Sequence, residues 1–230
     1  MRRRALLEIL GGLALLAAAQ IGSFGAVPQR TRVVDRIVAQ IEGDVILQSQ
    51  VRELGAFQQL IEGRAESDDR LLAELIEQWV VQTEASAAQF PQPAQSEVDR
   101  ELIRLTAQFG TPEAYASKLK EVGLSAAQAR DLLSSQIYVQ RYLDYKFRPS
   151  VQLDSKQVEE YYRMELLPEL QKKNQPVPPR TKVDDQIREL LAQRAISDLS
   201  GKWLDETKSR LKIQIMPPLA MGNAPKNSGL

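Results

Sequence analysis

Adjacent acidic residues are the feature of this sequence that comes nearest to a catalytic or metal-binding pattern. Such pairs include Asp68-Asp69, Glu159-Glu160 and Asp184-Asp185. Neighbouring carboxylates could perform acid–base catalysis or bind a hard cation through oxygen. Each of these pairs, however, lies in the first turn of a predicted helix or on its polar face, where acidic side chains interact favourably with the helix dipole. We therefore expect solvated structural residues, and predict no catalytic residue and no metal site.

Two missing residue types exclude most other chemistry. The sequence has no His and no Cys. It therefore cannot form a Ser-His-Asp triad, a thiolate nucleophile, a disulfide or a His- or Cys-ligated metal site. Gly43 reads as a turn glycine, and no phosphate-binding motif is present. Lys and Arg number 30, as do Asp and Glu, so the basic excess typical of nucleic-acid binders is absent. We expect a protein that is not an enzyme, needs no cofactor and binds no nucleic acid.

The N-terminus has the pattern of an export signal. Three arginines, Arg2 to Arg4, precede an apolar run at residues 9–19 that ends in Ala17-Ala18-Ala19. A basic start, an apolar centre and small residues at a cleavage point are typical of signal peptides. The apolar run is shorter than the roughly 20 residues that span a bilayer. We expect residues 1–26 to be a signal peptide, with an uncleaved N-terminal anchor as the alternative.

The remaining chain reads as helices between small strands. Residues 33–47 are rich in Val and Ile, and Gly43-Asp44 gives a turn signal near their middle. The apolar positions also fit a helix, but β-branched residues and the glycine favour a hairpin. A strand follows at residues 211–215, which alternate apolar and polar residues. Amphipathic patterns and capping residues predict helices at residues 48–62, 67–88, 96–110, 111–123, 125–147, 154–168 and from Thr181 through Leu204.

The isolated strand at residues 211–215 sets the expected architecture. Its backbone groups need hydrogen-bond partners, and the hairpin near the start of the chain is available. We therefore expect a mainly α fold, a helical core with a small β element formed by the N-terminal hairpin and the C-terminal strand. The expected module spans residues 27–215. It comprises an N-terminal part (31–175) and a returning helix and strand (180–215), and residues 216–230 form a disordered tail.

One stretch of the sequence resembles a known family. Residues 33–54, VVDRIVAQIEGDVILQSQVREL, resemble the segment that follows the signal peptide in the SurA N-terminal-domain family of periplasmic chaperones. Leu71–Gln82 and Thr111–Gly123 are similar to further family segments. So is DQIRELLAQR at residues 185–194, followed by Trp203-Leu204 and a basic strand. The resemblance covers roughly residues 33–215.

The chain departs from that family in one large respect. SurA-like proteins usually carry parvulin prolyl isomerase domains between the middle helices and the last helix. Here only the short stretch between Arg163 and Arg180 separates those helices, and no parvulin motif is present. The resemblance therefore implies the chaperone core without isomerase activity. A family member that bears the isomerase name without the isomerase domain is one alternative to weigh.

The resemblance also implies a function. By analogy, the protein would be a periplasmic holdase that binds unfolded outer-membrane β-barrel proteins and aids their folding and assembly without ATP. Aromatic side chains suit such binding because they offer large amphipathic surfaces. The candidate client-binding residues are Phe57, Phe109, Tyr115, Tyr138 and Tyr142. The alternative is an envelope scaffold, held in the inner membrane by the N-terminus, that docks one specific partner.

Overall fold

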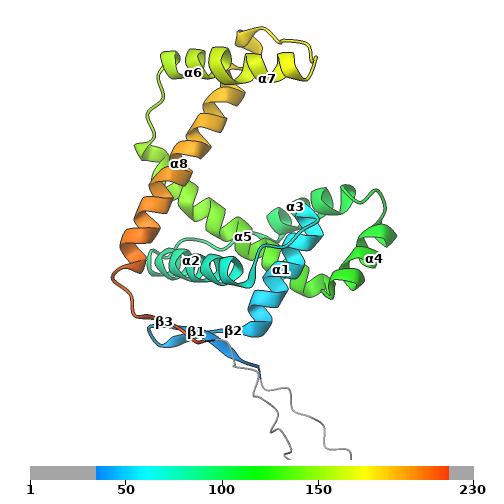
Figure 1. The fold of residues 1–230 in the computed structure, drawn as a ribbon, viewed down its shortest axis with the longest axis vertical. Coiled ribbons are helices and arrows are strands. Elements are labelled where there is room, and N and C mark those ends of the chain that lie inside the picture. The colour runs from blue at the N-terminus through cyan, green and yellow to red at the C-terminus, as the bar shows by residue number, and fades with distance from the viewer. Residues whose placement is uncertain (1–34, 218–230) are drawn as a thin grey trace, which may run out of the picture. The chain divides into compact units, whose positions relative to one another are not determined.

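The computed structural model describes residues 35–217 (Figure 1). The predicted signal peptide or anchor and residues 218–230 of the predicted tail lie outside the described residues. The predicted tail begins two residues too early, because the Met216 N–H donates to the Val38 carbonyl at 2.9 Å. The described chain is mainly helical and carries one small sheet, as the sequence predicts. The helices are α1 (Gln48–Glu62), α2 (Asp68–Ala87), α3 (Gln95–Ala107), α4 (Pro112–Val122), α5 (Ala126–Phe147), α6 (Ser155–Tyr161), α7 (Leu167–Lys172) and α8 (Asp184–Lys208).

The sheet joins the two ends of the described chain. Its strands are β1 (Ile37–Ile41), β2 (Asp44–Leu47) and β3 (Ile213–Ile215), in the order β2-β1-β3. Both pairings are antiparallel, and β3 adds to the free edge of the hairpin with Gln40 opposite Gln214. The predicted pairing of the C-terminal strand with the N-terminal hairpin is confirmed. The strand is shorter than predicted, because Leu211 and Lys212 precede it.

Local capping explains where several helices begin. The Thr111 hydroxyl oxygen accepts the Ala114 N–H at 3.1 Å, and Pro112 follows in the first turn of α4. Ser125 and Gln128 form a capping box at the start of α5, as Asp154 and Gln157 do for α6. These boundaries agree with the prediction to within one residue.

Pro168 does not end a helix, and this corrects the prediction. The chain continues from α6 through a π-helical turn at Tyr162–Leu166 into α7, where Pro168 occupies the first turn. Proline is tolerated there because the first N–H groups of a helix have no intrahelical partner. The last helix also begins at Asp184 rather than Thr181, because Arg180–Lys182 form a 3₁₀ turn.

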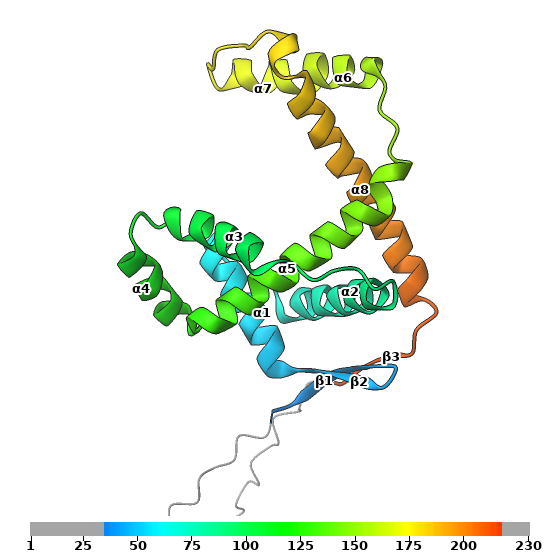
Figure 2. The same cartoon turned by 180° about the vertical axis from the view of Figure 1, so that it is seen from behind.

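Three clusters of buried side chains hold the elements together. One packs the sheet on α1 and α2 and includes Leu54 and Ile76. A second joins α1 to α3, α4 and α5, and a third joins α2 and α5 to α8. The third cluster includes Leu204 of α8, Val81 of α2 and Tyr142 of α5. The predicted return of the last helix onto earlier helices is therefore confirmed (Figure 2).

Candidate functional site

The aromatic residues predicted to bind clients lie mostly in the core. Phe57 is fully buried, and Tyr115, Tyr138 and Tyr142 are each less than a tenth exposed. Phe109 is half-buried and packs against Tyr115, with ring centroids 5.4 Å apart. We correct the prediction for the four buried residues, Phe57, Tyr115, Tyr138 and Tyr142, which fill the interior because large apolar groups gain most free energy by leaving water. The half-buried Phe109 stays a candidate.

Tyr138 and Tyr142 both contact Phe90, which follows α2. The Tyr138 hydroxyl donates to the Phe90 carbonyl at 3.2 Å. The Phe90 ring in turn meets the Tyr142 ring edge-on, with centroids 5.5 Å apart. Burial raises the pKa of the Tyr142 phenol above its usual range, and the nearby Glu84 carboxylate adds to this. Both tyrosines therefore act as structural residues between α5 and the end of α2.

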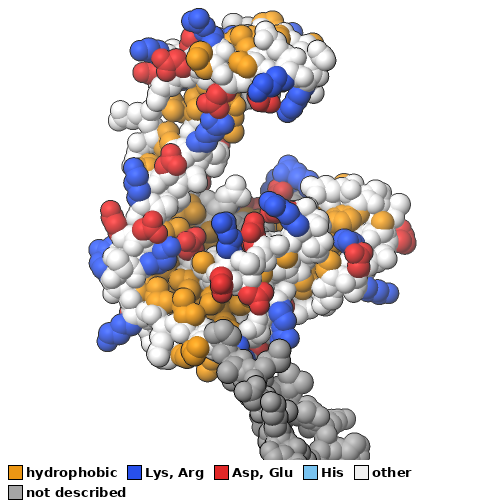
Figure 3. Space-filling view, in the orientation of Figure 1, with side chains coloured by type: hydrophobic (Ala, Val, Ile, Leu, Met, Phe, Trp, Pro, Cys, Tyr) orange, Lys and Arg blue, Asp and Glu red, His pale blue; other side chains and the backbone are white. Residues whose placement is uncertain are grey.

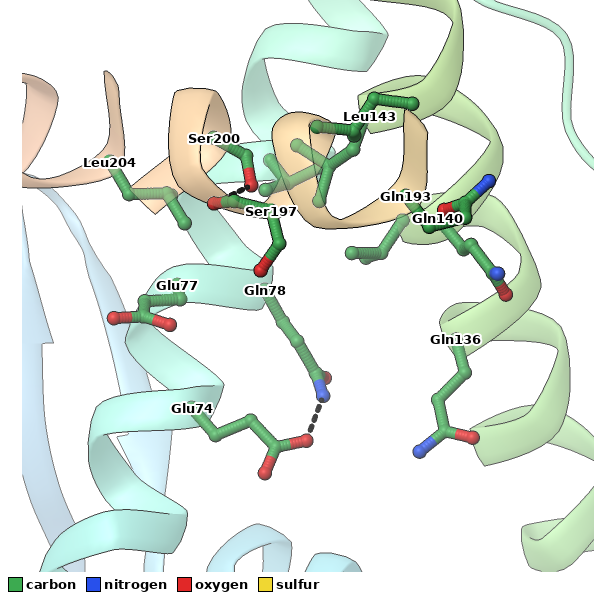
Figure 4. Close-up of a pocket in the computed structure, with 13 residues that line it drawn as sticks. Glu74, Glu77, Gln78, Gln136, Gln140, Leu143, Gln193, Ser197, Ser200 and Leu204 are labelled. Atoms are coloured by element: carbon green, nitrogen blue, oxygen red, sulfur yellow. Dashed lines mark hydrogen bonds between the residues drawn. The ribbon is translucent and has the colours of Figure 1, made fainter. Parts of the chain in front are cut away.

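A groove lies where α2, α5 and α8 meet, and we call it the central groove (Figure 4). Its volume is about 310 Å³, and most of its accessible surface is apolar. Elsewhere on the surface, hydrophobic side chains gather between α2 and the sheet (Figure 3). The lining residues are Glu74, Glu77, Gln78, Val81, Gln136, Val139, Gln140, Leu143, Gln193, Ile196, Ser197, Ser200 and Leu204.

Each helix contributes one stripe of side chains to the central groove. On α5 the stripe runs from Gln136 through Val139 and Gln140 to Leu143, and the other helices repeat this spacing. Residues three, four and seven apart share one helix face, so three such stripes can enclose a common space. The sequence pattern of each helix predicts its own stripe. The groove itself appears only when α8 has returned to lie beside α2 and α5.

Glutamine amides form much of the polar rim. Gln78 donates to Glu74 at 3.1 Å, and Gln193 donates to Glu189 at 2.8 Å. No hydrogen bond joins the amides of Gln136 and Gln140 to another residue of the described chain. Amides without protein partners can pair with the backbone of a bound peptide. The central groove thus combines apolar side chains with free donors and acceptors.

The charges of the central groove are two carboxylates. Glu77 forms an ion pair with Lys208, whose Nζ lies 2.7 Å from Oε1. Glu74 forms no ion pair with any described Lys or Arg, and its partners are the neutral amides of Gln58 and Gln78. Partial burial raises the pKa of Glu74 above its usual range, the two amides oppose this, and the carboxylates Glu77 and Glu62 raise it further.

A second groove lies between the α6–α7 segment and the N-terminal half of α8. Its volume is about 640 Å³, and its lining includes Leu170, Val177 and Leu190. Val177 and Leu190 are well exposed for apolar residues. The Tyr162 hydroxyl donates to the Pro178 carbonyl at 2.8 Å. This hydrogen bond ties the segment between α7 and α8 to the π-helical turn that precedes α7. The fold therefore offers two separate apolar surfaces to solvent.

The predicted acidic pairs have structural surroundings. Asp68-Asp69 and Asp184-Asp185 occupy the first turns of α2 and α8. Glu159 and Asp184 both pair with the Arg180 guanidinium. Within residues 35–217, no group of three or more acidic side chains is arranged to hold a metal ion. None of the helices in that range combines the length and apolar character needed to cross a bilayer.

No protein-family model matches this chain and no curated protein matches it, so the resemblance to SurA-like chaperones rests on the residues of the sequence itself.

Proposed function

We propose that this protein is an ATP-independent periplasmic holdase that binds unfolded outer-membrane proteins and aids their folding and assembly. The observation that carries the proposal is the central groove, a solvent-open apolar surface with a polar rim. The sequence resemblance of residues 33–54 to the SurA N-terminal-domain family supports the same function. Unfolded β-barrel chains need such protection because their exposed strands pair edge to edge.

The size of the groove suits weak and reversible binding. A cavity of about 310 Å³ is at the lower end of ligand pockets, so it holds only a few side chains. Each apolar side chain that becomes fully buried contributes roughly 1.5–3 kcal/mol, and association itself costs several kcal/mol. One groove therefore holds a segment weakly, which permits release to the folding machinery without ATP.

Further apolar groups on the surface extend the contact area. Ile103, Tyr145 and Met164 are each more than three-fifths exposed, and they lie on α3, α5 and the π-helical turn. Together with the second groove, they give one unfolded chain several weak attachment points. Binding at several points raises the overall affinity without making any single contact strong.

Light scattering tests the proposal. A denatured outer-membrane β-barrel protein is diluted into buffer without ATP, with increasing amounts of the full-length chain. We expect suppression at near-stoichiometric ratios. Leu143→Gln, which places an amide in the central groove, should weaken suppression. Leu133→Gln is the matched control, because this half-buried leucine also lies on α5 but packs in another cluster.

Unchanged scattering with the wild-type chain would contradict the holdase function. A pull-down that recovers one saturable envelope partner would then favour the scaffold alternative. A proline-limited refolding assay addresses the isomerase alternative. We expect no acceleration there, because the sequence lacks a parvulin domain.

A further inference from the structure

The central groove has a chemical bias that goes beyond apolar binding. Among its lining residues, Glu74 and Glu77 carry negative charge and none carries positive charge. Lys208 neutralises Glu77 from outside the lining, so Glu74 remains the uncompensated charge. The whole chain has a formal net charge of zero, so this negative potential belongs to the groove and not to the protein at large.

The position of Glu74 makes its charge available to a bound segment. Glu74 projects from α2 on one side of the open space, and Gln136 projects from α5 on the other (Figure 4). Both hydrogen bonds to the Glu74 carboxylate come from neutral amides, Gln58 at 2.8 Å and Gln78 at 3.1 Å. A half-buried carboxylate without a cation is costly, and a nearby positive charge would relieve that cost.

The rim also indicates the conformation of the occupant. Gln136 and Gln140 present amides with no hydrogen-bond partner in the described chain, and they lie one helical turn apart on α5. A helical segment satisfies its own backbone groups, whereas an extended segment presents unpaired N–H and C=O groups. The amides of Gln136 and Gln140 can therefore hydrogen-bond to the backbone of an extended bound segment.

Resting on the proposed holdase function, we propose that the central groove selects extended client segments in which a Lys or Arg lies next to a short aliphatic stretch. The aliphatic side chains enter between Val139, Leu143 and Ile196. The backbone pairs with Gln136 and Gln140, and the basic side chain reaches Glu74. Glu74 is thus a specificity-determining residue of the groove.

Three fluorescein-labelled peptides test this specificity with the full-length chain. They share one aliphatic core and differ only in flanking residues, which are Lys, Gln or Glu. Fluorescence anisotropy at low salt should show the Lys peptide binding about fivefold tighter than the Gln peptide, as expected for a partly exposed ion pair, with the Glu peptide weakest. Added salt should reduce the difference.

Two variants make the test specific. Glu74→Gln should remove most of the preference for Lys while the Gln peptide still binds. Asp69→Asn makes the same change of charge on the exposed first turn of α2, outside the groove, and should keep the preference. Melting temperatures of both variants establish that they are folded.

The outcomes distinguish a failure of charge selection by Glu74 from a failure of the holdase function. Equal binding of the three peptides, or a preference that survives in Glu74→Gln, overturns the charge selection. If the chain still suppresses client aggregation in that case, the holdase function stands. If no peptide binds and light scattering is also unchanged, both the function and the inference are overturned.

Discussion

Gln40 of β1 and Gln214 of β3 lie directly opposite each other in an antiparallel register, so the two ends of the described chain share one sheet. Leu211 and Ile213 pack against the core cluster beneath that sheet. A chain that ends at Arg210 loses both the strand and this packing. We expect its unfolding free energy to fall by roughly 2–4 kcal/mol, since the two side chains are only partly buried.

The control for this truncation is a chain that ends at Pro217 and keeps β3. It should melt at the temperature of the full chain, because every described contact remains. Thermal denaturation followed by circular dichroism measures both. Equal melting temperatures for the two truncations would contradict a structural role for β3.

Two helical glycines should respond in opposite ways to a larger side chain. A Cβ atom at Gly55 of α1 would lie 2.9 Å from Leu71 Cδ1, whereas one at Gly201 of α8 would meet nothing within 4 Å. Gly55→Val should therefore destabilise by roughly 1–3 kcal/mol through overpacking. Gly201→Ala should stabilise by about 0.5–1 kcal/mol through helix propensity. Urea unfolding measures both, and a stabilised Gly55→Val would refute the close approach of α1 and α2.

Phe57 provides a test of the corrected role of the aromatic residues. Its side chain is fully buried between α1 and the α3–α5 helices. Phe57→Ala should cost roughly 3–5 kcal/mol of stability. Phe57→Leu, the milder variant, should suppress client aggregation as well as wild type at temperatures where it is folded. If the Phe57→Leu protein is folded but no longer suppresses client aggregation, Phe57 takes part in client binding and the corrected role is wrong.

An ion pair between the end of α5 and α8 predicts a pH dependence of stability. The Arg148 guanidinium contacts both Glu189 oxygens, at 2.7 and 3.0 Å. Its hydrogen bonds, with a further one from Gln193, lower the pKa of Glu189 to about 2. A carboxyl whose pKa is lower in the folded state stabilises above its unfolded pKa. That contribution is lost as pH falls toward the folded value.

Glu189→Gln should therefore reduce stability at neutral pH by about 0.5–1 kcal/mol, a small cost because both side chains are roughly half exposed. The difference from wild type should shrink below pH 4.5 and vanish near pH 2. Glu160→Gln, which breaks an exposed pair with Lys156 at 3.8 Å, should have no measurable effect. A Glu189→Gln difference that stays constant across this pH range would exclude the proposed linkage.

The sequence predicts this fold well wherever a boundary depends on neighbouring residues. The cap at Thr111, the capping box at Ser125 and the turn at Gly43 act over a few positions, and the structure places elements where they indicate. Pro168 predicts a helix end because a proline in an interior turn normally breaks the helix. The π-helical turn before it gives the proline a first-turn position instead.

The candidate site was harder to predict for a different reason. Aromatic residue type does not decide between core packing and client binding, and the client-binding candidates Tyr138 and Tyr142 are both buried. The central groove depends on which faces of α2, α5 and α8 meet. These faces meet because α8 returns to pack beside α2 and α5. The residue pattern of a single helix cannot predict this arrangement.

Site-specific photocrosslinking tests most directly whether unfolded clients bind in the central groove. A photoreactive benzoylphenylalanine is placed at Gln140, an exposed groove position, or at Glu113, an exposed position on α4. The full-length chain is then irradiated with a denatured or a folded outer-membrane β-barrel protein. We expect crosslinks from position 140 to the denatured client alone, and far fewer from position 113. Equal crosslinking from both positions, or none from position 140, would contradict the central groove as the client-binding site.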